Sequence, residues 1–152
     1  MIEITKSPTA DTRTCDWSKV TKEQLTASSL THILDVAMGL RMFGDMLQAA
    51  AEVHDFDKID DIDSFHRDFQ TGFKQTEWWD RHRKINRHHL NVADGIPADV
   101  NLIDVIEHMV DCVMAGMARS GSVYELKLSD EVLQAAFRNT VEKLKEDVVV
   151  EQ

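Results

Sequence analysis

The sequence of 152 residues has few cysteines and lacks any long hydrophobic run. Its two cysteines, Cys15 and Cys112, lie far apart and form no CxxC pair, so we expect neither a disulfide framework nor a thiolate zinc site. No apolar run approaches the roughly 18–20 residues that a membrane span needs, and no charged-then-apolar leader begins the chain. We therefore expect a cytoplasmic protein without a membrane partner.

Basic residues are also scarce, because 17 Lys and Arg stand against 27 Asp and Glu and the net charge is −10. A protein that binds long nucleic acids needs Lys and Arg to neutralise the phosphates, so long DNA is a poor candidate partner. The proportions of hydrophobic (43%) and charged (29%) residues are ordinary for a soluble globular protein. A chain of this length is most simply a single domain.

Most of the chain has a helical pattern of apolar residues. Residues 1–20 are polar and predict an irregular arm, with Trp17 as the residue that could fix it, before a helical domain over residues 21–148. Residues 21–55 predict one long helix, or two helices broken near Gly39 or Gly44. Further helices are expected over residues 55–69, 78–89, 101–121 and 129–149, with only residues 122–128 and 146–152 having any strand character. The sequence therefore predicts an all-α bundle.

The segment Asp80–Leu90, DRHRKINRHHL, gathers three of the seven histidines and four Arg or Lys residues. If it is helical, His82, Asn86 and His89 share one face, whereas His88 points elsewhere or ends the helix. Neutral imidazoles suit Mn, Fe, Co, Ni or Zn, and carboxylates extend the range to harder ions such as Mg. The surrounding cations would attract an anionic substrate. The alternative is a solvated basic helix with surface histidines.

Two other histidines could take part in a metal site. His54 and Asp55 are adjacent, so both could face one divalent ion while the carboxylate reaches a second. Alternatively, His54 simply meets the negative end of a helix dipole. His32 lies beside an apolar stripe, where a histidine is more often partly buried than a metal ligand.

The segment NLIDVIEHMVD places four polar residues on one helical face: Asp104, Glu107, His108 and Asp111. Such a face is either the solvated side of an amphipathic helix or a set of buried ligands. Small residues, Ala115 and Ala118, continue the same stripe and favour close packing. The residues themselves leave both interpretations open.

Taken in order, the candidate ligands resemble those of the HD-domain superfamily of metal-dependent phosphohydrolases, which are all-helical. A closer resemblance is to a family of short HD-like proteins of phages and bacteria with the motifs HDxSK, WxxHxxxNxHH and ExxxDWxxAG. Here these motifs become HDFDK (residues 54–58), WDRHRKINRHH (79–89) and EHMVDCVMAG (107–116). Two departures are Asp57 in place of serine and Cys112 in place of tryptophan.

The resemblance implies a single-domain HD-like bundle that hydrolyses a small phosphorylated molecule with one or two divalent metal ions. The expected substrate is a nucleotide, whether a monoester, a triphosphate or a cyclic diester. The expected ligands of the first ion are His32, His54, Asp55 and Asp111. The expected ligands of the second are His82 and either His89 or His88, with Asp55 as the bridge.

Several other residues receive roles in this hypothesis. Lys58 is expected to meet a phosphate oxygen, and Glu107 is either a general acid–base or a residue that orients a ligand. The expected phosphate contacts are Arg83 and Arg87, and Asn86 would position a ligand or water. Trp78 and Trp79 could stack on a base, although a core or lid position suits them better.

Two other classes of function remain open. The first is an HD-like module that binds a nucleotide or metal without turnover. The second is an acidic interaction protein, for example of a phage in its host's cytoplasm, with histidines only on the surface. The apolar face of the last helix serves equally for packing within the chain or for a homo-oligomer.

Overall fold

The computed structural model describes residues 1–9, 11–75 and 77–151. It is mostly helical, which confirms the all-α class. Its backbone divides into two compact units, Met1–Asp45 with Glu142–Gln152, and Met46–Val141. Among the described residues, no helix combines the length and the apolar character that crossing a membrane requires.

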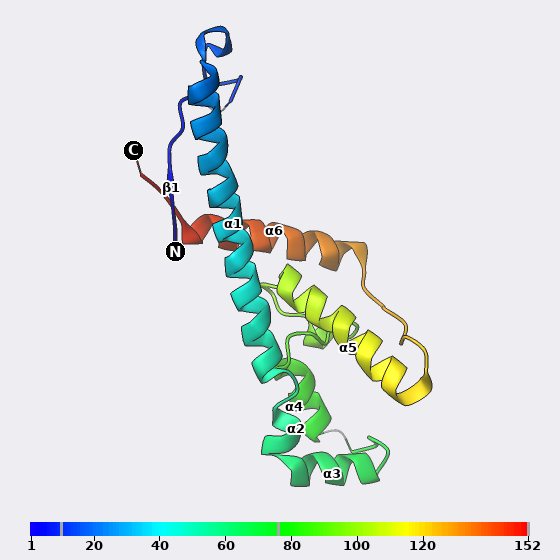
Figure 1. Cartoon of the computed structure of the whole chain (residues 1–152). Helices are drawn as coiled ribbons and strands as arrows, with labels where there is room; N and C mark the ends of the chain where they lie inside the picture. The colour runs from blue at the N-terminus through cyan, green and yellow to red at the C-terminus, as the bar shows by residue number, and fades with distance from the viewer. Residues whose placement is uncertain (10, 76, 152) are drawn as a thin grey trace. The chain divides into compact units, whose positions relative to one another are not determined.

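In the first unit, the two ends of the chain form a small parallel sheet. Strand β1 (Ile2–Thr5) pairs with β2 (Val148–Glu151), and Ile2 lies opposite Val148 (Figure 1). Residues with β-branched side chains favour strands, which explains this pairing of Ile and Val segments. The arm predicted as irregular therefore contains a strand. The short 3-10 helix η1 (Trp17–Lys19) follows, and its Trp17 is exposed rather than fixed in a core.

The longest element, α1 (Lys22–Val53), is one unbroken helix of 32 residues. Its start is fixed by a capping box, because Gln24 N donates to Thr21 Oγ1 (3.2 Å) and Thr21 N donates to Gln24 Oε1 (3.0 Å). Gly39 and Gly44 do not interrupt it, so the first of the two predicted alternatives is the observed one.

The second unit contains the remaining helices in the order α2 (Asp57–Asp60), α3 (Ile62–Gln70), α4 (Glu77–Ile85), η2 (Ala93–Gly95), α5 (Leu102–Ser120) and most of α6 (Asp130–Asp147). Residues 55–69 thus form two helices rather than the single one predicted. α5 begins with a second capping box, in which Asn101 accepts from Ile103 N (2.9 Å) and Asp104 accepts from Asn101 N (2.8 Å). It ends at Gly121, whose φ of 72° is the left-handed conformation that glycine favours.

Two groups of side chains hold this unit together. The buried apolar residues Leu90, Val100 and Ala136 form a small hydrophobic core. The start of α5 is tied to α6 because Leu102 N donates to Thr140 Oγ1 (2.8 Å).

The second group is aromatic and surrounds Trp78, which is 1% exposed. The ring of Phe65 on α3 lies 4.4 Å from the Trp78 ring, centroid to centroid. The buried carboxylate of Asp68 accepts hydrogen bonds from Trp78 N (2.9 Å) and Trp79 N (3.2 Å). Asp68 thus satisfies amide groups at the start of α4 in the manner of an N-cap. α3 therefore fixes the beginning of the helix that carries His82.

Candidate metal centre

The candidate site lies within the second unit, where the residues after α1 meet the turns after α4 and the face of α5. Asp55 occupies the tight connection between α1 and α2 with a positive φ of 54°. Residues other than glycine rarely adopt this conformation, although aspartate tolerates it better than most. Backbone strain of this kind is concentrated at functional sites.

The Asp55 carboxylate is surrounded by imidazole nitrogens. Its Oδ1 lies 3.4 Å from His82 Nε2 and 3.5 Å from His88 Nε2, and its Oδ2 lies 3.6 Å from His54 Nε2. Oδ2 also accepts a hydrogen bond from the Lys58 ammonium. By contrast, Asp55 Oδ1 and His88 Nε2 are buried without a hydrogen-bond partner among the described residues. Buried polar atoms normally have a hydrogen-bond partner, so a cation bound between Asp55 Oδ1 and His88 Nε2 would supply the interaction that both atoms lack here.

Two groups of three residues bring ligand atoms to within 4.8 Å of one another. One consists of His54, Asp55 and His88, and the other of Asp55, His82 and His89. Asp55 belongs to both, as the sequence hypothesis expects of a bridging carboxylate. In the second group His89 Nε2 and His82 Nε2 are 2.9 Å apart, so two ring nitrogens converge on one place.

Carboxylates on the far side of the rings orient two of these imidazoles. His82 Nδ1 lies 2.8 Å from Asp57 Oδ2, and His54 Nδ1 lies 2.8 Å from Glu107 Oε1. If each Nδ1 carries the proton that it donates to its carboxylate, the lone pair of each Nε2 is left facing Asp55. Metal-binding histidines in proteins are commonly held in this manner. Of the two roles predicted for Glu107, this geometry favours the orienting one.

The charge states of the site also suit a metal. Burial lowers the pKa of His82, and burial with the neighbouring His88 and His82 lowers the pKa of His89 to about 3. Both rings are therefore neutral at neutral pH, which is the state that binds metal ions. Burial alone would raise the pKa of Asp55, but its hydrogen bond and charge interaction with Lys58, together with its interactions with His54 and His88, outweigh that effect and lower the pKa.

These shifts predict that the metal-free protein loses stability as the pH falls from about 6.5. In that range an unfolded chain protonates His89 near its ordinary pKa of 6.5, whereas the folded chain does so only near pH 3. The unfolded state then binds more protons, so the free energy of unfolding falls by up to roughly 1.4 kcal/mol per pH unit. Urea unfolding in the presence of a chelator between pH 7 and 4.5 measures this slope. A His89→Gln variant should flatten it, and an equally steep slope in the variant would contradict this assignment.

The two tryptophans of the WxxH segment form part of the wall of the site. The ring of Trp78 stacks on His82 with centroids 4.6 Å apart, and Trp79 stacks on it at 5.3 Å. Trp79 also meets His89 edge-on at 5.4 Å. Trp78 is buried, as a core role requires, and the two indoles cover the ring of His82, which is fully buried.

The structure pairs the predicted phosphate-binding arginines with acids. Arg83 bonds Asp80 (2.6 Å) and Asp94 (2.5 Å). Arg87 bonds Asp99 and, through two nitrogens, Asp104, which belongs to the capping box of α5. These acids tie both guanidinium groups to the surrounding fold, and their role in binding phosphate stays a prediction.

Asn86 lies in the turn after α4, because the helix ends at Ile85 rather than extending to His89 as predicted. Its Nδ2 donates to Asp57 Oδ1 (2.9 Å) and to the His82 carbonyl oxygen (3.0 Å). Asn86 therefore holds the carboxylate that orients His82, which is close to the ligand-positioning role expected for it.

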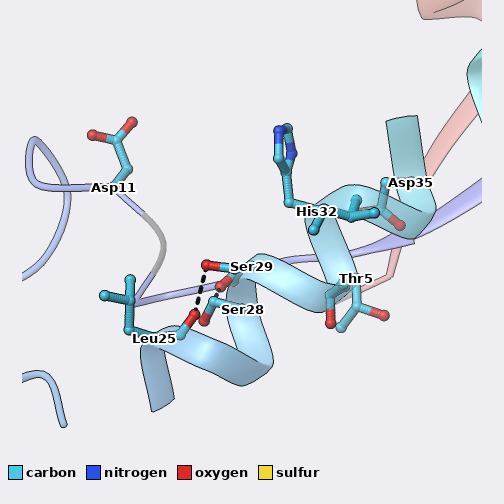
Figure 2. Close-up of a pocket in the computed structure, with 10 residues that line it drawn as sticks. Thr5, Asp11, Leu25, Ser28, Ser29, His32 and Asp35 are labelled. Carbon is cyan, nitrogen blue, oxygen red and sulfur yellow. Dashed lines mark hydrogen bonds between the residues drawn. The ribbon is translucent and has the colours of Figure 1, made fainter. Parts of the chain in front are cut away.

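Two predicted ligands lie outside both groups of three. Asp111 Oδ1 is 3.8 Å from His54 Nε2, at the edge of the first group. His32 belongs to the first unit, where it projects from α1 and lines a pocket with Asp11, Ser28 and other residues (Figure 2). Its role as a ligand stays a prediction.

Two residues that hold the site were not found from the sequence. Asp57 stood out only as a departure from the HDxSK motif, yet it bonds both His82 and Asn86. Gly95 in η2 is buried, and a Cβ added there would lie 2.7 Å from the His89 carbonyl oxygen. Only glycine allows η2 to pass this close to the histidine-bearing turn. The one available signal was the punctuation of its loop by Gly and Pro.

In comparisons with known proteins, no family model, curated protein or solved structure matches this chain. A fold class alone does not identify a function, so the chemistry of the site carries the argument. That chemistry is a half-buried carboxylate, that of Asp55, shared by two groups of histidines and placed beside the ammonium group of Lys58. Such a site can bind divalent cations and an anion next to them.

Proposed function

We propose that this protein is a metal-dependent phosphohydrolase of the HD-domain type that acts on a small phosphorylated substrate, for which we favour a nucleotide. One observation carries the proposal. The buried Oδ1 of Asp55, which has no hydrogen-bond partner within residues 1–9, 11–75 and 77–151, faces Nε2 atoms of His82 and His88 at 3.4 and 3.5 Å. The resemblance of the three sequence motifs to HD-like proteins supports the same conclusion.

The donor set fits divalent transition metals. His54, Asp55 and His88 would hold one ion, and Asp55, His82 and His89 a second, with Asp111 as a further ligand at the edge of the first group. One carboxylate with two imidazoles suits Mn, Fe, Co, Ni or Zn. When bound, such ions would polarise a phosphoryl group and lower the pKa of a coordinated water toward about 7.

The chain itself contributes charge and orientation. The half-buried Lys58 ammonium lies at Asp55 and is placed to stabilise negative charge that develops on a phosphoryl oxygen. Glu107 fixes the ring of His54, and Asp57 fixes that of His82. The indoles of Trp78 and Trp79 cover His82, so the electrostatic interactions of this ring are shielded from bulk water and are stronger than they would be in solution.

The test is the metal content of the wild-type protein beside an Asp55→Asn variant. Both are stripped with a chelator, equilibrated with a mixture of Mn, Fe, Co, Ni and Zn, and analysed by mass spectrometry. We expect one or two ions per chain in the wild type and none retained in Asp55→Asn, because Asp55 belongs to both groups. Asp60→Asn is the matched control, since Asp60 is exposed only five residues away. The retained metal then sets the conditions for a screen of nucleotide hydrolysis.

The other outcomes separate the rival functions. Absence of stoichiometric metal from every variant would contradict the proposal and favour the interaction protein. Metal that is bound through Asp55 without any phosphate release from nucleotides would favour the non-catalytic binding module. Equal metal loss in Asp55→Asn and Asp60→Asn would show that surface charge, rather than this site, attracts the ions.

A further inference from the structure

A hollow of about 470 Å³ lies in the second unit, between the last turns of α1 and the face of α5. Six of its lining residues are apolar, namely Leu47, Ala50, Ala51, Ile106, Val110 and Met114. The other three are His54, Glu107 and Asp111, so one end of the hollow is the edge of the candidate metal centre. The volume lies in the range of pockets that hold small molecules, roughly 300–1,000 Å³.

The apolar part of this pocket is unusually open to solvent. Val110 is 46% exposed and Met114 is 67% exposed, although both side chains are hydrophobic. Exposed apolar surface beside a few polar groups is typical of a ligand-binding groove. The flexible thioether of Met114 can adapt to a bound group.

The charges of the pocket show which part of a ligand it suits. Within the described part of the chain, neither lysine nor arginine lines it, and two of its polar residues are the acids Glu107 and Asp111. A phosphate would be repelled here, whereas Lys58 and the imidazoles around Asp55 offer it a favourable place. The apolar walls offer few hydrogen bonds to the hydroxyl groups of a sugar.

We infer that this pocket receives the uncharged aromatic or apolar group of a phosphate ester whose phosphoryl group lies at the metal centre. The inference rests on the proposed function and narrows its substrate class. Esters with a flat or apolar group, such as a nucleobase, fit the pocket, whereas inorganic polyphosphates and simple sugar phosphates leave it unfilled. His54 connects the pocket to the metal centre, because it lines the pocket and also belongs to one of the two groups of candidate metal ligands.

The experiment compares the binding of two non-hydrolysable probes, phenylphosphonate and methylphosphonate, to Mn²⁺-loaded protein by isothermal titration calorimetry. We expect phenylphosphonate to bind about tenfold more tightly or better, because its ring buries apolar surface that the methyl group lacks. Ala50→Phe should fill the pocket and abolish this preference while the metal content stays unchanged. Ala49→Phe is the matched control, since Ala49 is exposed on the same helix and does not line the pocket.

A second variant guards against misfolding of Ala50→Phe. Val110→Asn makes the exposed side of the pocket polar and should also reduce the preference for phenylphosphonate. Three outcomes would overturn the inference: equal affinity for the two probes, no binding of either probe, or a preference that survives both variants. In each of these cases the bound Mn²⁺ would still support the proposed function. A dimer that dissociates in Ala50→Phe but not in Ala49→Phe would assign the pocket to a second copy of the chain and also overturn it. If the protein bound none of Mn, Fe, Co, Ni and Zn, the proposed function would fail and the inference with it. If it bound another of these metals in place of Mn²⁺, the two probes are compared with that metal.

Discussion

Replacing Trp78 with alanine is expected to lower the free energy of unfolding by about 3–5 kcal/mol. Trp78 is the largest of the fully buried side chains, and its ring packs against Phe65 and His82. Its removal would leave a cavity between α3 and α4 that the neighbouring rings can fill only in part. Because small domains are stable by only about 5–15 kcal/mol, this single change would remove a large share of the stability.

Urea unfolding followed by circular dichroism measures this effect, and two variants serve as controls. Trp17→Ala makes the same substitution at a tryptophan that is 67% exposed, so a much smaller loss is expected. Trp78→Phe keeps an aromatic ring and removes the indole Nε1, which is buried without a hydrogen-bond partner among the described residues. It should therefore cost far less than Trp78→Ala. Similar losses in Trp78→Ala and Trp17→Ala would show that Trp78 does not support this core.

The helical class and several helix boundaries could be predicted because they depend on local sequence. Apolar spacing of three to four residues marks α1 and α5, and the ends of α5 carry their own signals in Asn101 and Gly121. The end of α4 was predicted too late. The backbone N–H of Asn86 still donates to the His82 carbonyl oxygen (3.0 Å), but its side chain bonds Asp57, and periodicity does not report a contact with a residue so distant in the sequence.

Features that depend on distant residues were beyond the sequence. β1 pairs with β2 from the opposite end of the chain, and a pairing of that range has no local signature. The contacts of Arg83 with Asp94 and of Arg87 with Asp104 likewise follow from tertiary structure. The candidate ligands, and Asp55 as the carboxylate shared by two groups, were predicted from the motifs, whereas the left-handed backbone at Asp55 emerges only from the fold.

Asp57 is the clearest case of a residue whose importance the fold alone makes visible, and it gives the last prediction. We expect Asp57→Asn to weaken metal binding by about 10–100-fold, the usual effect of removing a carboxylate that orients a ligating histidine. Asp57 accepts hydrogen bonds from both His82 Nδ1 and Asn86 Nδ2. An asparagine has one acceptor oxygen, so its own amide group would face one of these two donors, and the negative charge behind the His82 ring would be lost.

Competition with a fluorescent chelator measures the metal dissociation constants, with Asp60→Asn again as the exposed control. A second measurement distinguishes positioning from a purely structural role. Nitrogen-15 chemical shifts of the imidazoles report which ring nitrogen carries the proton, and they should show His82 protonated at Nδ1 in the wild type but mixed between the nitrogens in Asp57→Asn. Unchanged affinity together with an unchanged tautomer would mean that the short Asp57–His82 contact serves only the packing of α2 against α4. Weakened binding with an altered tautomer would show that Asp57 keeps the Nε2 lone pair of His82 directed at Asp55.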